Sequence, residues 1–409
     1  MFKSIFLILL ILRTAWQISL ELLNLHYSTN SKAEVPEILK DHFDQRDFER
    51  SKQYLKEKVT LKVISEVVQF FVTLYLILYG LARIERLFFE YSPFLQAIML
   101  FGTVGLIFFV VNVIFKSYSV FVIETRYGFN TTKMKTFILD QMLTVALFTG
   151  FATIVVSILL WLLKHQIWWW QATIVAFGMI LFFWFIQPIF IAPLFYKFSK
   201  IEDRELEEKI RELLNKSSMK VPNIFKVNAS KRTKKQNAYL TGIGKSRRLV
   251  LYDTLLNYPT EEILAIVAHE LGHHVRKHIP KDIVIFSSYA AIVLYLTNTV
   301  YQYISKTDAF GVQKPHTAFF YSFLFVSFVI YFFEPVMNYL SRKMEYEADT
   351  YSAQLMGSPV PLVNALKRLI KANLSNLNPL PLYKIWYYSH PAPEERINHL
   401  VSKISKNSA

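Results

Sequence analysis

The sequence of 409 residues contains no cysteine. This absence excludes disulfide bonds and thiolate metal ligands, so any metal ion must be held by histidine and carboxylate side chains. The sequence also lacks basic clusters beside aromatic or glycine-rich segments, the pattern typical of RNA-binding proteins. Its formal net charge of +15 is instead dispersed between hydrophobic segments. We therefore expect no nucleic-acid partner, and we relate the positive charge to membrane topology and to anionic membrane lipid.

Hydrophobic residues are more abundant than a soluble domain requires. They make up 53% of the chain, which includes 35 phenylalanines and 23 tyrosines. About 20 apolar residues form a helix long enough to cross a bilayer. The expected membrane spans are residues 4–23, 63–82, 94–115, 142–163, 168–192, 283–304 and 317–340. The sequence thus predicts an all-α polytopic membrane protein with about seven transmembrane helices.

The first hydrophobic segment has an alternative interpretation as a signal peptide, because Lys3 precedes its apolar run. However, Arg13 interrupts this run, and no cleavage site with small residues follows it. We interpret the segment as a span that the protein retains.

The loops between the expected spans alternate between many and few basic residues. The loop before the second span is rich in lysine and arginine, whereas the loop after it offers only Arg83 and Arg86. The positive-inside rule then places the N-terminus outside and the C-terminus in the cytoplasm.

Four regions follow from this topology. Residues 1–195 hold spans one to five with their loops, and residues 196–282 form a cytoplasmic segment. Residues 283–340 hold spans six and seven, and residues 341–409 form a cytoplasmic C-terminal segment that completes the candidate site.

The segment 196–282 is predicted to fold as a small α+β unit. Residues 201–219 have the periodicity of an amphipathic helix. Two β-rich runs at 237–244 and 247–256 resemble a hairpin, with the turn at Gly244-Lys245-Ser246. A further helix is expected to begin with Thr260 as its cap and to end before Pro280.

This last helix carries the sequence His269-Glu270-Leu271-Gly272-His273. Residues four apart on a helix lie only about 40° apart around its axis, so both imidazoles face one ion. Glu270 lies about 100° further round, where its carboxylate can act on a water molecule without binding the metal. The pattern predicts a zinc hydrolase; the alternative is a helix with solvated histidines.

A competing pair, His274 and His278, has the same spacing. Val275 stands where the pattern requires a glutamate, so we interpret both histidines as basic surface or capping residues.

A third ligand is expected from the segment after the seventh span. Glu345 and Asp349 are four residues apart and share a helix face, whereas Glu347 is about 200° from Glu345 and points away. Glu345 is the predicted ligand, Asp349 the predicted partner of a ligand imidazole, and Glu347 a solvated charge. Alternatively, the three acids only balance Arg342 and Lys343 at the membrane surface.

Further blocks of sequence accompany the histidine motif in a fixed order. They are Tyr127-Gly128-Phe129-Asn130, Ala192-Pro193-Leu194-Phe195, Asn237-Ala238-Tyr239, Leu249-Val250-Leu251-Tyr252-Asp253-Thr254-Leu255, Ser341-Arg342-Lys343-Met344-Glu345-Tyr346-Glu347-Ala348-Asp349, and His390-Pro391 with Arg396. Together with the motif they resemble the type I CAAX prenyl endopeptidases, polytopic zinc metalloproteases, over about residues 60–400.

The resemblance implies spans that enclose a water-filled chamber, with a zincin-like metalloprotease domain and one Zn²⁺ ion at its cytoplasmic side. His269, His273 and Glu345 would be the zinc ligands, and Glu270 the general base and acid. The N-terminal stretch is poorly matched, and the absence of cysteine is typical of a bacterial member. We therefore expect the bacterial inner membrane, or the endoplasmic reticulum membrane if the source is eukaryotic.

The resemblance also implies roles for three residues outside the metal site. Asn237 would lie on the edge strand that binds the peptide, His390 would stabilise the oxyanion, and Arg396 would help to hold the site.

The leading functional hypothesis is an integral-membrane zinc endopeptidase that removes the C-terminal tripeptide of prenylated CAAX proteins, with membrane lipid as a further partner. One alternative is a broad quality-control metalloprotease of the bacterial heat-shock type, for which we expect fewer spans. Another is a transporter or scaffold with structural zinc. The three predicted ligands leave a fourth position open, which favours a catalytic over a structural site.

Overall fold

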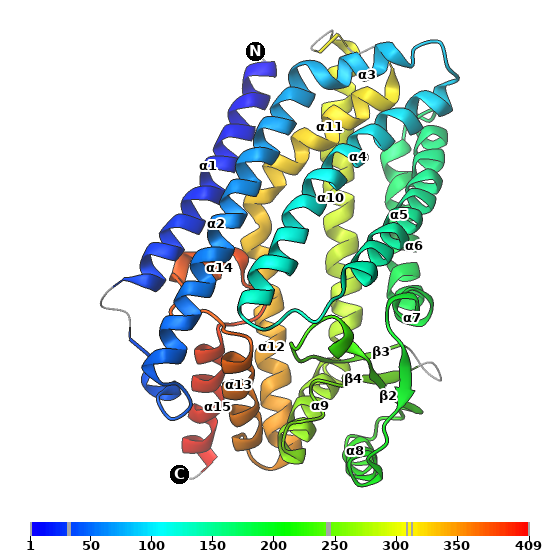
Figure 1. Ribbon diagram of the computed structural model, residues 1–409. Coiled ribbons are helices and arrows are strands. Elements are labelled where there is room, and N and C mark those ends of the chain that lie inside the picture. The colour runs from blue at the N-terminus through cyan, green and yellow to red at the C-terminus, as the bar shows by residue number, and fades with distance from the viewer. Residues whose placement is uncertain (1, 31–33, 243–246, 308–309, 312–313, 408–409) are drawn as a thin grey trace.

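A computed structural model of the chain describes residues 2–407 apart from 31–33, 243–246, 308–309 and 312–313. Long helices run side by side, and a small sheet lies at the end of the molecule that holds the C-terminus (Figure 1). The N-terminus lies at the opposite end, as an odd number of spans requires. The predicted fold class, a polytopic helical protein with a small α+β unit, is confirmed.

Seven helical stretches within the described residues are long and apolar enough to cross a membrane. Their bounds are Phe2–Thr29 (α1), Gln45–Leu87 (α2 and α3), Pro93–Glu124 (α4 and a π-helical turn), Met134–Leu162 (α5), Trp168–Phe195 (α6, a π-helical turn and α7), His278–Lys306 (α10) and Pro315–Met356 (α11 and α12). The predicted number of spans is thus confirmed, and most helices extend beyond the predicted limits. Two further expectations stay predictions: that these helices enclose a chamber, and that the candidate site is on the cytoplasmic side.

Several of these stretches are interrupted by local changes of helix type. The component elements are α2 (Gln45–Tyr75), α3 (Leu81–Leu87), α4 (Pro93–Tyr118), α6 (Trp168–Ile186), α7 (Ala192–Phe195), α11 (Pro315–Ile330) and α12 (Glu334–Met356). The turns that join them are Leu76–Gly80, Ser119–Glu124, Gln187–Ile191 and Tyr331–Phe333. Helix α12 runs from the membrane bundle toward the sheet (Figure 1). It therefore couples the last span directly to the candidate site.

The sheet has four strands in the order β1-β2-β4-β3. They are β1 (Phe198–Lys200), β2 (Asn223–Val227), β3 (Ala238–Thr241) and β4 (Arg248–Tyr252). The predicted hairpin is confirmed, because β3 and β4 are antiparallel with Leu240 opposite Leu249. Its predicted turn at 244–246 lies outside the described residues. Since β3 pairs only with β4 in this order, one side of β3 is an edge of the sheet.

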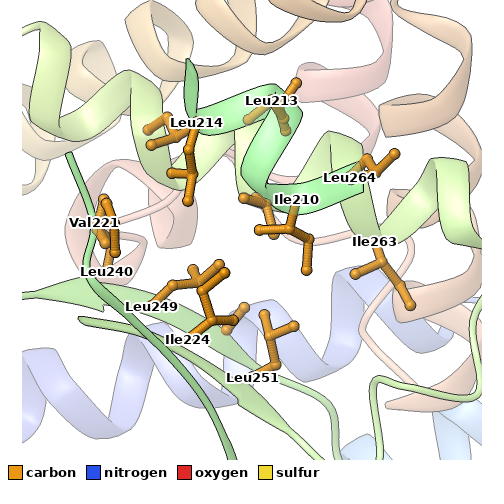
Figure 2. Packing of buried hydrophobic residues seen from close by; sticks show 14 of the residues in the cluster. Ile210, Leu213, Leu214, Val221, Ile224, Leu240, Leu249, Leu251, Ile263 and Leu264 are labelled. Atoms are coloured by element: carbon orange, nitrogen blue, oxygen red, sulfur yellow. The ribbon is translucent and has the colours of Figure 1, made fainter. Parts of the chain in front are cut away.

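The predicted amphipathic helix forms as α8 (Arg204–Lys216) and covers the sheet. The Asp203 carboxylate caps it by accepting a hydrogen bond from the Leu206 N–H at 3.0 Å. Ile210 and Leu214 point from α8 toward the apolar side chains of the sheet and of α9, as Figure 2 shows. Burial of this cluster anchors the motif helix to the sheet.

The motif helix α9 (Thr260–Val275) differs from the prediction at both ends. Thr260 is its first residue rather than its cap, and the preceding Pro259 provides no capping side chain. Lys277 adopts a left-handed conformation with φ of 57°, which ends the path of α9. Helix α10 (His278–Lys306) begins immediately afterwards. Pro280 therefore lies in the first turn of α10, where its missing N–H is tolerated.

The three C-terminal helices are α13 (Val360–Ala372), α14 (Pro381–Tyr387) and α15 (Pro393–Asn407). Two of them, α13 and α15, pack against the segment that joins α1 to α2, whereas α14 packs against α1 and α12. A hydrophobic core joins Leu366 and Ile397 to Leu39 and Phe48, which precede or begin α2. Residues at the two ends of the sequence thus share one core beside the candidate site.

Candidate active site

Helices α9 and α12 approach so closely that their backbones touch at Gly272. A Cβ atom placed on Gly272 would lie 2.8 Å from the Cα atom and 3.0 Å from the carbonyl oxygen of Ala348. Only glycine allows this approach without displacement of α12. The contact brings the histidine motif of α9 against the acidic residues of α12.

His269, His273 and Glu345 lie together as predicted. The Nε2 atoms of the two histidines are 3.2 Å apart. Glu345 Oε2 is 3.5 Å from His269 Nε2, and Glu345 Oε1 is 3.4 Å from His273 Nε2. Ligand atoms about 2.0 to 2.1 Å from a tetrahedral Zn²⁺ ion are separated by about 3.3 Å. In this triangle of residues, Glu345 turns a different oxygen to each histidine, and all three distances are close to that separation. The group therefore has the donor set and the size to hold one metal ion.

The burial of Glu345 also fits a metal ligand. Its side chain is only 5% exposed, and its Oε2 atom makes no hydrogen bond of good geometry with the described residues. His390 and Arg396 lie 3.0 and 3.7 Å from this oxygen. A buried carboxylate oxygen without a well-directed hydrogen bond is nevertheless costly. A metal cation at the centre of the triangle would satisfy it.

On the His269 side, two residues hold the ring as predicted. His269 Nδ1 is 2.9 Å from Asp349 Oδ1, which leaves Nε2 free to bind a metal. Arg396 in turn donates to both oxygens of Asp349, at 2.9 and 2.6 Å. Burial lowers the pKa of His269, but hydrogen bonds to the Asp349 and Glu345 carboxylates outweigh it, and the pKa is about 9. The carboxylates thus make a site that favours a cation.

On the His273 side, the structure corrects the interpretation of His278 and Glu347. His278 is 2% exposed, and its Nδ1 atom is 2.9 Å from His273 Nδ1. Its Nε2 atom is 3.1 Å from Glu347 Oε2, which also accepts from Lys281 at 3.1 Å. His278 is therefore no surface or capping residue, and Glu347 is no isolated solvated charge. Together they hold the ring of His273 so that Nε2 would face a metal ion bound beside Glu345.

The edge of β3 lies beside the motif helix. His274 is half-buried, with its Nε2 atom 3.3 Å from the Leu240 carbonyl oxygen, so it is not the predicted surface residue. Burial lowers the pKa of His274, which favours the neutral ring. Burial raises the pKa of Glu270, although a hydrogen bond from the Leu240 backbone opposes the change. A half-buried glutamate of raised pKa is a stronger base than a fully exposed one.

Asn237 and His390 lie at the margin of this group. Asn237 is exposed and directly precedes β3, and its carbonyl oxygen accepts a hydrogen bond from Tyr252 N–H at 3.0 Å. His390 follows α14, and its side chain is 66% exposed. His390 Nδ1 is 3.0 Å from Glu345 Oε2. The structure thus brings His390 to the metal site, while the roles of both residues stay predictions.

The seven apolar helical stretches are those of a membrane protein. At one end of them, two imidazoles and a carboxylate can hold a metal ion beside the half-buried Glu270. This combination defines a membrane metallopeptidase. Two family models match consecutive parts of the chain. One describes the CAAX prenyl protease N-terminal region with five membrane helices and matches residues 24–197. The other describes peptidase family M48 and matches residues 200–404. The chain belongs to peptidase family M48.

Similar proteins cover nearly the whole chain. CAAX prenyl protease 1 of Saccharomyces cerevisiae is 29% identical over 93% of this chain and 92% of its own length. The uncharacterized metalloprotease YhfN of Bacillus subtilis is 31% identical over 68% of this chain and 67% of its own length. The crystal structure of S. mikatae Ste24p superposes with a TM-score of 0.90 at 27% identity, covering 98% of this chain and 99% of that one. The chain is accordingly a membrane metalloendopeptidase of the CAAX protease type that acts on peptides or proteins. The matches include bacterial and eukaryotic proteins, so they do not support the expected bacterial source.

Proposed function

We propose that the protein is a zinc-dependent endopeptidase that removes C-terminal peptides from prenylated proteins at the membrane. The observation that carries the proposal is the group of His269, His273 and Glu345, in which the two Nε2 atoms are 3.2 Å apart and each has a Glu345 oxygen within 3.5 Å. Two nitrogen ligands and one carboxylate are typical of catalytic zinc sites, in which the fourth position stays open. One Zn²⁺ ion per chain would be held there, and it would polarise the peptide carbonyl and activate water.

Glu270 is the proposed general base and acid. It lies on the same helix as the two histidines, and burial raises its pKa. A raised pKa lets the carboxylate take a proton from the attacking water and then deliver it to the leaving amine.

The edge of β3 is the proposed binding surface for the peptide. The backbone groups of Leu240 are directed away from β4 and toward α9, where they contact Glu270 and His274. An extended peptide that replaced these side-chain contacts along the edge would form main-chain hydrogen bonds without regard to its own side chains. It would also run directly past Glu270. Asn237, at the start of the strand, would contact one end of this peptide.

His390 and Arg396 have different proposed roles. The exposed ring of His390 next to Glu345 is free to donate a hydrogen bond to the oxyanion that forms on the scissile carbonyl. Arg396 acts more indirectly, because it fixes Asp349 and through it the ring of His269.

The proposal also states that the substrate carries a prenyl group and that cleavage takes place at the lipid bilayer. Both statements are supported by the match of both family models in one order and by the similarity to CAAX prenyl protease 1 over 93% of the chain. Seven apolar helical stretches would give a prenyl chain access from the bilayer and are proposed to enclose a chamber. By the positive-inside rule, the site faces the cytoplasm.

The test compares three substrates with the protein purified in detergent. These are a farnesylated CAAX peptide, the same peptide without the farnesyl group, and an unmodified membrane protein. We expect release of the C-terminal tripeptide from the farnesylated peptide, loss of this activity with a zinc chelator, and weaker cleavage of the other two. Preferred cleavage of the unmodified membrane protein at many positions would instead support the quality-control protease.

A further inference from the structure

We propose that the first membrane helix α1 is a positioning element for His390, acting through Glu21, Asn24 and Ser28. These residues hold the segment 376–388, which leads to His390. The proposal rests on the proposed function for the role of His390, but its structural part can be tested separately.

The three residues form a buried polar stripe near the C-terminal end of α1. They are spaced three and four residues apart, so they lie within about 60° of one another around the axis. Glu21 and Asn24 are each 1% exposed and Ser28 is 2% exposed. Polar side chains buried in a membrane helix are costly unless they have partners. The stripe therefore requires a polar partner from elsewhere in the fold.

Glu21 pairs with Lys62 of α2, and all three residues also contact the segment that begins α14, about 350 residues further along the chain. The Ser28 hydroxyl donates to the Asn378 carbonyl oxygen at 2.8 Å, and Asn24 Oδ1 accepts from the Leu380 N–H at 2.9 Å. The Tyr383 hydroxyl donates to Glu21 Oε1 at 2.9 Å. These bonds fix the start and the first turn of α14, which lies beside α1 in Figure 1.

Helix α12, which carries Glu345, holds the other side of α14. Arg342 Nη1 donates to the carbonyl oxygens of Lys384 and Tyr388 at 3.2 and 2.6 Å. Helix α14 is thus clamped between α1 and the helix that provides the third metal ligand. Its last residue, Tyr387, precedes His390 by only three positions.

His390 depends on this clamp because its own ring is poorly anchored. Its side chain is 66% exposed, and its ion pair with Glu345 is the one side-chain contact that holds the ring among the described residues. The position of the ring is therefore set by the backbone that leaves α14. The proposed metal ligands do not depend on the clamp in this way, because they lie within helices α9 and α12.

The central variant is Asn24→Ala, with Ser28→Ala as a milder second variant. The matched control is Ser19→Ala, an exposed polar residue of the same helix. We expect Asn24→Ala to lower kcat on the farnesylated peptide by about tenfold with little change in KM, because a misplaced group weakens the chemical step. Zinc affinity, measured by chelator competition, should be unchanged.

A double-mutant comparison then separates positioning from general damage. In a His390→Ala background, Asn24→Ala should cause less than about a twofold further loss of kcat, because the two changes act through one group. An undiminished tenfold loss in that background, or a parallel loss of zinc affinity, would overturn the proposal.

Amide hydrogen exchange tests the clamp without any catalytic assay. Asn24→Ala and Ser28→Ala should speed exchange in residues 376–390 and leave α9 unchanged, whereas Ser19→Ala should change neither. If exchange in 376–390 stays at the parent rate, the clamp is wrong. If exchange responds but the parent protein cleaves no peptide, the clamp stands and the proposed function fails.

Discussion

Replacement of His278 by alanine tests how the metal ligand His273 is oriented. In the metal-bound protein His273 must present Nε2, so its Nδ1–H needs an acceptor, and His278 Nδ1 lies 2.9 Å away. The variant leaves this N–H without a partner beside a residue that is 2% exposed in the parent. An unsatisfied buried donor costs about 1 to 3 kcal/mol. Without metal the ring is free to change its tautomer, so the cost falls mainly on the metal-bound state.

At about 1.4 kcal/mol per tenfold change, this cost corresponds to a rise in the zinc dissociation constant of about five- to 150-fold. The range agrees with the roughly 10- to 100-fold effect of losing a hydrogen-bond partner of a metal ligand. The assay is competition with a chelating dye at fixed pH. His165→Ala, in the exposed turn between α5 and α6, is the control.

A third variant, His278→Asn, sharpens the test. In this variant, the Oδ1 atom of asparagine replaces the Nδ1 atom of histidine as the acceptor. The shorter side chain does not replace the bond from His278 Nε2 to Glu347. We expect the zinc affinity of the variant to lie between those of the parent and the alanine variant. An alanine variant that folds and binds zinc within about twofold of the parent would refute the proposed role of His278.

Three further outcomes are expected. Glu270→Gln should retain zinc but lower kcat by a factor on the order of 10² to 10⁴, because the base is lost while the ligands remain; unchanged cleavage would remove Glu270 from the mechanism. Removal of zinc by a chelator should abolish cleavage and lower the melting temperature, both restored by added Zn²⁺, whereas full activity after verified metal removal would contradict the metal's role. Gly272→Ala should destabilise the protein by about 1 to 3 kcal/mol and weaken zinc binding, since the new Cβ would lie 2.8 Å from Ala348 Cα. Normal thermal stability and zinc affinity of this variant would show that α9 and α12 can separate freely.

Local periodicity was enough to predict the features that repeat along one element. Hydropathy located the spans, and the four-residue spacing of His269 with His273 and of Glu345 with Asp349 predicted which side chains share a helix face. The same rule placed Glu347 on the other side of α12, which the structure agrees with. The rule did not show what lies on that other side.

The features that the sequence did not reveal depend on a change of chain direction. His278 is five residues beyond His273, a spacing that does not bring side chains together on one helix. The left-handed conformation of Lys277 turns the chain so that the first residue of α10 contacts α9. Non-glycine residues seldom adopt that conformation, and nothing in the local sequence signals it. The contacts of α1 with α14 were equally hidden, because they join residues about 350 positions apart.

Helix α12 provides one of the three proposed metal ligands and supports the other two. Glu345 is itself a ligand, Asp349 holds His269, and Glu347 holds His273 through His278. Glu345 and Asp349 share one face of α12 and reach His269 directly, whereas Glu347 lies on the other face and reaches His273 through His278. A rotation of α12 would therefore disturb all three ligands together, whereas a change in α10 would affect His273 alone. Since α12 belongs to the seventh apolar stretch, Pro315–Met356, the last span and the third proposed ligand lie on one helical stretch.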